Sequence, residues 1–192
     1  MALSGRLPWG GLAVSRQPRG DAREAEFSHL FEEFSAPIYN YVLRMVGDRD
    51  RAADITQDTF IKAYRKLDSR TDATSTRSWL YRIATNTAID EIRRRRLVSP
   101  MGPDQSAYDG RPDGRPGPED QVMAATLDER LQRALFSLRP NHRQCLLLSD
   151  LEDMSAQQIA DVMGLSYGAV RTLLCRARGE MRRALAAEGF AR

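Results

Sequence analysis

Residues 155–178 read SAQQIADVMGLSYGAVRTLLCRAR, and this stretch carries the signals of two short helices joined by a tight turn. Ser155 can cap the first helix, Gly164 can supply the positive φ that the turn needs, and Ser166 can cap the second helix. The pattern predicts a helix-turn-helix, whose second helix normally enters the major groove of duplex DNA. Six apolar residues are expected to form its small core, with Leu165 plugging the turn: Ile159, Ala160, Val162, Leu165, Val170 and Leu174.

The second helix of this motif exposes side chains that can contact DNA. They include donors suited to guanine and to phosphate, at Tyr167, Arg171, Thr172, Cys175 and Arg176. The alternative is an ordinary corner between two helices of a bundle. Such a corner does not require arginines on its outer face.

The remainder of the chain predicts further helices, because apolar residues recur at steps of three and four and no strand-like alternation is present. Residues 1–25 are rich in Gly, Pro, Arg and Ala and are expected to be a disordered tail, while the acidic, Pro- and Gly-rich stretch 98–121 predicts a flexible linker. The expected fold is all-α, with two small helical domains joined by the linker. The predicted helices cover residues 27–46 (bent or restarted at Pro37), 51–67, 77–97, 119–137 and 141–151.

Composition excludes several classes of protein. The chain has 192 residues, of which 42% are hydrophobic and 29% charged. It contains no run of about 18 apolar residues, so we expect no membrane insertion, and its first 20 residues lack the apolar core of a secretory signal. Two cysteines, Cys145 and Cys175, and two histidines fit a cytoplasmic protein without a disulfide framework, a metal site or a cofactor. No nucleophile–base–acid set or Gly-rich phosphate loop indicates an enzyme.

The charge is distributed unevenly although the formal net charge is only +3. Residues 77–96 and 167–192 each hold six arginines against two acids, whereas residues 98–121 hold five acids against two arginines. Two basic regions separated by an acidic one suggest two contacts with a polyanion. The alternative is that these runs are simply solvated faces.

Two upstream stretches add to this pattern. The first is residues 54–65, DITQDTFIKAYR, where Asp54 and Asp58 share one helical face with Gln57 beside them. This face either meets a cationic partner or is simply a solvated acidic face. RSWLYRIATNTAID (77–90), followed by EIRRRR, mixes aromatic, amide and basic side chains that can stack on unpaired bases and hold phosphates. Trp79 and Ile83 are expected to be core residues, which leaves Arg82, Asn86 and four consecutive arginines unexplained by packing.

These three stretches, in this order, resemble an extracytoplasmic-function (ECF) sigma factor, the smallest type of the sigma-70 family of bacterial transcription initiation factors. The resemblance covers roughly residues 26–188. It implies that residues 26–97 form sigma region 2 and that residues 122–188 form region 4. It also implies that the 98–121 linker mimics nucleic acid in the RNA-exit path of the polymerase.

The resemblance implies partners and residue roles. The partners are core RNA polymerase (the β′ clamp helices and the β flap), promoter DNA and an anti-sigma factor. Capture of a flipped −10 base by the 69–76 loop would offset the free energy of unstacking without ATP. The polymerase-binding residues would be Asp54, Gln57, Asp58 and Lys62. The −10 residues would be Ser69, Arg70, Thr71, Asp72, Thr76, Arg77, Arg82, Asn86, Arg93 and Arg94. The −35 residues would be Ser155, Tyr167, Arg171, Thr172, Arg176 and Arg178.

The sequence departs from the family pattern in a few places. Leu173 and Cys175 lie where polar or basic residues are common, Asp153 stands where Gly is usual, and Ala156 where an aromatic residue is frequent. The tail before Glu24 has no counterpart in the family. The main rival hypothesis is a stand-alone regulator that binds duplex DNA as a dimer, but it gives the two upstream helices no role. A redox switch of the two cysteines is a further alternative to their being apolar filler.

Overall fold

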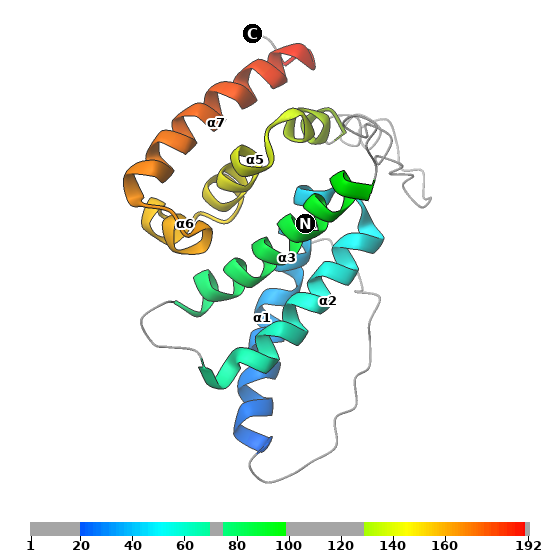
Figure 1. The fold of residues 1–192 in the computed structure, drawn as a ribbon, viewed down its shortest axis with the longest axis vertical. Coiled ribbons are helices and arrows are strands. Elements are labelled where there is room, and N and C mark those ends of the chain that lie inside the picture. Colours follow the sequence, from blue (N-terminus) through cyan, green and yellow to red (C-terminus); the bar gives the residue numbers. More distant parts are fainter. Residues whose placement is uncertain (1–19, 70–74, 99–128, 191–192) are drawn as a thin grey trace, which may run out of the picture.

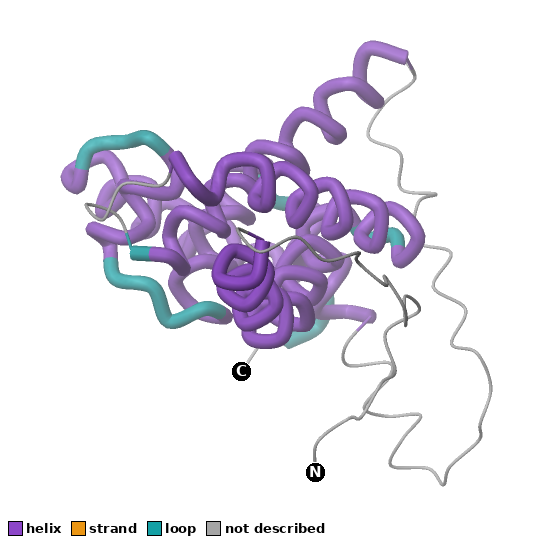
Figure 2. Tube along the Cα trace, turned by 90° about the horizontal axis from the view of Figure 1, so that it is seen from below, coloured by secondary structure: helices purple, strands orange, loops and turns teal. Residues whose placement is uncertain are grey.

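The computed structural model describes residues 20–69, 75–98 and 129–190, and every described segment is helix, turn or short connection (Figures 1 and 2). The all-α prediction is confirmed. Much of the predicted linker and tail, together with Arg70, Thr71 and Asp72, lies outside the described residues. The named elements are α1 (Gly20–Val46), α2 (Arg49–Lys66), η1 (Leu67–Ser69), α3 (Thr76–Val98), α5 (Pro140–Leu146), η3 (Leu147–Leu151), α6 (Ala156–Met163) and α7 (Tyr167–Ala187).

Helix α1 departs from its prediction in where it begins, and of the two alternatives at Pro37, a bend or a restart, the restart is excluded. It begins at Gly20, so the last six residues of the predicted disordered tail are helical. It also continues through Pro37 as one element. Proline removes one backbone hydrogen bond from a helix interior. Phe34 and Ile38, on either side of Pro37, are buried and hold this part of the helix against the core.

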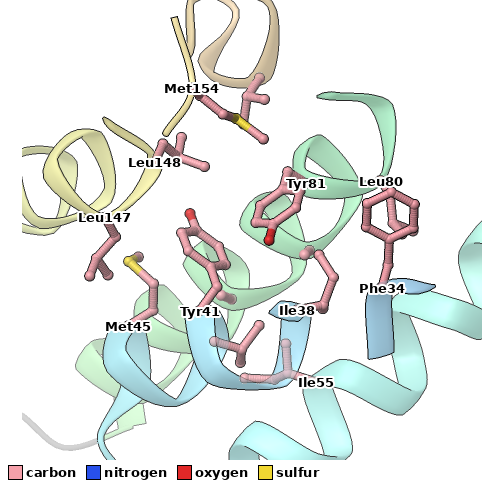
Figure 3. Packing of buried hydrophobic residues seen from close by; sticks show 14 of the residues in the cluster. Phe34, Ile38, Tyr41, Met45, Ile55, Leu80, Tyr81, Leu147, Leu148 and Met154 are labelled. Carbon is pink, nitrogen blue, oxygen red and sulfur yellow. The ribbon is translucent and has the colours of Figure 1, made fainter. Parts of the chain in front are cut away.

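The two halves of the chain share one hydrophobic core. Helices α1, α2 and α3 pack on one another, and α3 also packs along α6 (Figure 1). Figure 3 shows Tyr41 and Tyr81 at the centre, between Ile38 on one side and Leu148 and Met154 on the other. The Tyr41 hydroxyl lies 2.8 Å from Thr85 Oγ1, and the two tyrosine rings meet edge to face at 5.3 Å. The half that carries the helix-turn-helix therefore packs directly on the first half.

The predicted helix over 141–151 changes its geometry part-way. It is α-helical over Pro140–Leu146 and continues as a five-residue π-helix, Leu147–Leu151. Leu147 and Leu148 are buried in this wider turn. Beyond it, Asp153 has φ +47°, the left-handed conformation that a glycine adopts without strain. The described helices include none that is long and apolar enough to cross a bilayer.

Candidate polymerase and promoter interface

Helix α2 has one buried face and one polar exposed face. Thr56 and Thr59 are buried, and their hydroxyls donate to the carbonyls of Ala52 (2.6 Å) and Ile55 (2.7 Å), so the polar atoms on the buried side are satisfied. The opposite side exposes an acidic row with an apolar residue and a lysine. Its members are Asp54, Gln57, Asp58, Ile61 and Lys62.

The acidic row of α2 borders a notch between α2 and α3. The notch has a volume of about 240 Å³ and is lined by Asp54, Asp58 and Lys62 from α2 and by Asp90 and Arg94, among others, from α3. Lys62 Nζ donates to the Thr87 hydroxyl at 3.0 Å, so this side chain ties the two helices together. Asp54, Gln57 and Asp58 have no comparable packing duty within the described residues.

Helix α3 exposes three of its predicted −10 residues on one side. Arg82, Asn86 and Arg93 are exposed and follow one another at helical spacing. Trp79 and Ile83 pack against the core, as expected. Arg94 forms an ion pair with Glu91 one turn earlier. Thr76 is the first residue of the helix, and Ser69 is the last residue of η1.

Arg77, another predicted −10 residue, is engaged inside the chain. Its guanidinium donates to the backbone carbonyl of Glu152 and lies 3.3 Å from the Glu152 carboxylate. The Tyr81 hydroxyl donates to the same carboxylate. Burial and then the hydrogen bond to the Glu152 carboxylate raise the pKa of Tyr81 well above its usual value, so the hydroxyl stays protonated. Neither Glu152 nor Tyr81 was singled out from the sequence, because 71 residues separate them.

The helix-turn-helix has the predicted caps. The Ser155 hydroxyl accepts from the Gln158 backbone N–H (3.3 Å), and the Gln158 side chain accepts from the Ser155 N–H (2.9 Å), which forms a capping box. Gly164 has φ +65°, and the Ser166 hydroxyl accepts from the Ala169 N–H at 3.2 Å. Ser155 therefore has a structural duty in addition to any contact with DNA.

One prediction for the core of this motif is wrong. Leu165 does not plug the turn, since it is 42% exposed. Ile159, Ala160, Val162 and Val170 are buried as expected, and Leu174 is partly buried against them. Leu165 contributes to the turn through its backbone, because its N–H donates to the Ala160 carbonyl at 3.0 Å.

The predicted −35 residues of α7 lie on its exposed side. Tyr167, Arg171, Thr172 and Arg176 are all exposed, and the Arg171 guanidinium lies 5.9 Å from the centre of the Tyr167 ring. Arg178, the fifth of the predicted −35 residues that lie on α7, is also exposed. It forms an ion pair with Asp150 at 2.9 Å and donates to the Ser149 hydroxyl at 3.2 Å.

A second buried contact between the halves was not predicted. The Arg143 guanidinium is buried, donates to the carbonyls of Met45 (2.7 Å) and Phe136 (3.0 Å), and stacks on the Phe136 ring at 4.2 Å. Met45 is in the last turn of α1, where carbonyls lack helical partners. Within the described residues, no three or more potential metal-ligating side chains come together.

Comparison with known proteins identifies both halves. Residues 30–98 match the family model for sigma-70 region 2, and residues 128–181 match that for sigma-70 region 4. The ECF RNA polymerase sigma factor SigE of Mycolicibacterium smegmatis is 33% identical over 176 residues, which cover 92% of this chain and 68% of SigE.

Two solved structures share the fold. The sigma factor RpoE in its complex with NepR from Bartonella quintana superposes with a TM-score of 0.65 at 20% identity, covering 84% of this chain and 97% of RpoE. CnrH, in its complex with the cytosolic domain of CnrY, gives 0.63 at 25% identity over 85% of this chain and 90% of CnrH. The chain belongs to the ECF sigma factors of the sigma-70 family: it is an RNA polymerase sigma factor, and thus a transcription initiation factor and not an enzyme.

Proposed function

We propose that this sigma factor docks on the β′ clamp helices of core RNA polymerase through the acidic row of α2. The observation that carries the proposal is that Asp54, Gln57 and Asp58 are exposed on α2 while the opposite side of the same helix is core. Like charges one turn apart weaken a helix slightly, so a cationic surface would stabilise them. Lys62 contributes by holding α2 against α3.

Promoter contact is divided between two helices. Arg82, Asn86 and Arg93 on the exposed side of α3, with the segment 69–76, would hold the −10 element, and the exposed side of α7 would read the −35 duplex. Arginine donors suit both phosphate oxygens and the major-groove edge of guanine. Arg77 can join the −10 contacts only when it exchanges the Glu152 carboxylate for DNA.

Domain limits, location and further partners belong to the same proposal. Region 2 would span residues 26–97 and region 4 residues 122–188, with 98–121 as a linker, and region 4 would also meet the β flap. Such a factor works in the cytoplasm, where the polymerase and the chromosome are. We infer a protein partner of the anti-sigma type, and the complex of RpoE, which shares this fold, with the anti-sigma factor NepR supports such a partner.

Two variants test the residue assignments separately. Asp58→Arg should abolish competition with the wild-type chain for core polymerase and leave the helical circular dichroism unchanged, because Asp58 is exposed. Glu32→Arg, an exposed acid on α1, serves as the matched control and should bind normally. If Asp58→Arg unfolds the chain, or if it binds core polymerase as well as the control does, the docking assignment is wrong.

Arg171→Ala tests the −35 assignment on a promoter recovered by transcribing a genomic fragment library with the wild-type holoenzyme. Loss of one arginine contact to a base should reduce output about tenfold or more. On a template whose −35 element has been replaced, the variant and the wild type should give equal output. If the output of the variant relative to the wild type falls by the same factor on both templates, Arg171 has no role in −35 recognition.

Co-elution with core polymerase tests the rival hypothesis, because a stand-alone regulator would not co-elute with the enzyme.

A further inference from the structure

The first turns of α1 lie outside the match to sigma-70 region 2, which begins at residue 30. They nevertheless pack on the last turns of α2. Arg23, Phe27 and Phe31 follow one another at steps of four residues and so share one side of α1. The Phe27 ring meets the Tyr64 ring edge to face at 5.0 Å, and the Phe31 ring meets the Phe60 ring at 4.9 Å. The part of α1 that precedes the match is therefore fixed to the C-terminal end of α2.

Arg23 makes the contacts at the tip of this packing. Its Nη2 donates to the Tyr64 carbonyl at 2.6 Å, its Nη1 lies 3.0 Å from the Asp68 carboxylate, and its Cζ lies 4.5 Å from the centre of the Tyr64 ring. The Tyr64 carbonyl belongs to the last turn of α2, where a cation is favourable. The Arg23 side chain thus contacts both the end of α2, at Tyr64, and η1, at Asp68.

Placing the Arg23 side chain here costs free energy, and packing of α1 on α2 would not by itself require that cost. Its Nε is buried and has no hydrogen-bond partner. A buried N–H without a partner is unfavourable, and an exposed arginine would avoid it. The guanidinium stays because Tyr64 and Asp68 hold its other two nitrogens. Leu67, between these residues, is buried in the core, so the whole turn before Ser69 is fixed.

The same part of α1 also faces the start of α3. A wide cavity of about 790 Å³ is lined by Glu26, His29 and Glu33 from α1 and by Ser75, Thr76 and Arg77 from the other side. Ser75 caps α3 by accepting from the Ser78 N–H at 3.2 Å. The first turns of α1 thus contact Asp68, which directly precedes Ser69, and face Ser75 and Thr76 across the cavity.

We propose that Arg23 is a positioning residue for promoter recognition: by holding Tyr64 and Asp68 it fixes the end of α2 and η1, and with them the place of Ser69, the first of the predicted −10 residues. It does not itself touch DNA. The inference rests on the proposed role of Ser69, Thr76 and the exposed side of α3 at the −10 element. Its consequence is that discrimination among −10 sequences depends on a residue outside the region-2 match.

The test uses the full chain with core polymerase on a library-derived promoter and on copies with single −10 substitutions. The readout is the ratio of output from each substituted copy to that from the parent, because this ratio does not change when part of the protein is inactive. Arg23→Ala should lower the discrimination at one or more −10 positions about threefold. Its affinity for core polymerase, measured by competition, should stay within about twofold of wild type, since the acidic row of α2 is untouched.

Charge reversal isolates the contact with Asp68. Arg23→Glu and Asp68→Arg should each lose discrimination, and the double variant should regain part of it, because the ion pair is restored with its ends exchanged. Glu32→Ala, another charge change on α1, is the control and should discriminate as the wild type does.

The outcomes separate this inference from the proposed function. Arg23→Ala with wild-type ratios at every −10 position overturns the positioning role, even if total output falls with the folded fraction. A double variant no better than the single ones overturns the ion-pair route. If the wild-type holoenzyme itself does not distinguish the −10 templates, the proposed −10 function has failed first, and with it this inference.

Discussion

Glu152→Ala should destabilise the fold, because Glu152 is a buried acid at the contact between the two regions. The Glu152 side chain is only 8% exposed, although it belongs to the region-4 half and its partners Tyr81 and Arg77 belong to region 2. Tyr81 is fully buried and keeps its proton, so its hydroxyl needs an acceptor. Alanine at position 152 removes that acceptor.

The size of the effect can be worked from these contacts. Leaving a buried hydroxyl without a partner costs about 1–3 kcal/mol. The Arg77 side chain is 37% exposed, so water replaces most of what it loses and this adds less than about 1 kcal/mol. Together the terms give a loss of about 1–4 kcal/mol in the free energy of unfolding, a substantial part of the ~5–15 kcal/mol that holds a typical domain.

Urea unfolding followed by circular dichroism measures this loss. Asp150→Ala is the matched control: Asp150 pairs with Arg178, both side chains are about half exposed, and the expected cost is below about 1 kcal/mol. Tyr81→Phe combined with Glu152→Ala should show a coupling free energy of about 1 kcal/mol or more. If Glu152→Ala behaves like Asp150→Ala, or if the coupling is absent, the carboxylate does not serve the tyrosine and the reasoning is refuted.

Three further predictions concern the same packed arrangement. Arg143→Ala should lower the free energy of unfolding, measured in urea, by about 2–4 kcal/mol. The Met45 and Phe136 carbonyls lose their donor, and the Phe136 ring loses the cation stacked on it. A decrease of less than about 1 kcal/mol would contradict the burial of this arginine. Burial raises the pKa of the Cys145 thiol to about 11, above its unfolded value of 9.0. The buried neutral thiol therefore contributes its full stabilisation below pH 9, and this contribution is lost as the pH rises toward 11, because the unfolded chain loses the thiol proton first. The free energy of unfolding should therefore fall across that window by up to about 1.4 kcal/mol per pH unit from this group, and Cys145→Ala should fall less steeply in parallel titrations. Asp153→Gly should raise the melting temperature, with a gain of up to about 1 kcal/mol, because Asp153 is held at φ +47°; an unchanged or lower melting temperature would show that its backbone is unstrained.

The helix-turn-helix could be predicted almost completely from its sequence, because its determinants are local. Ser155, Gly164 and Ser166 act within three or four residues of their own positions, and each adopts the predicted cap or turn geometry. Leu165 was mistaken for core because apolar character alone does not reveal the direction in which a turn residue points.

The longer-range contacts could not be predicted in this way. Arg23 lies in a stretch whose composition suggests disorder, and its ordering depends on Tyr64 and Asp68, more than forty residues away. Arg143 is charged yet buried, so a hydropathy pattern assigns it to the surface. The exposed site residues on α2 and α7 were predicted correctly as exposed because the period of a helix separates its two sides, whereas their individual roles remain proposals.

The pairing of α2 with α3 shows why the exposed charges of these helices are available for binding. Thr56, Thr59 and Thr87 lie on buried sides, where hydropathy would place larger apolar residues, and each hydroxyl donates to the carbonyl four residues earlier. A satisfied threonine is short and allows two helices to approach closely without an unpaired polar atom. Packing is thus completed by the buried sides together with Lys62, which donates to Thr87. The acids of α2 and the arginines of α3 on the outer sides are not needed to hold the helices together, which leaves them available for the proposed contacts with the polymerase and the promoter.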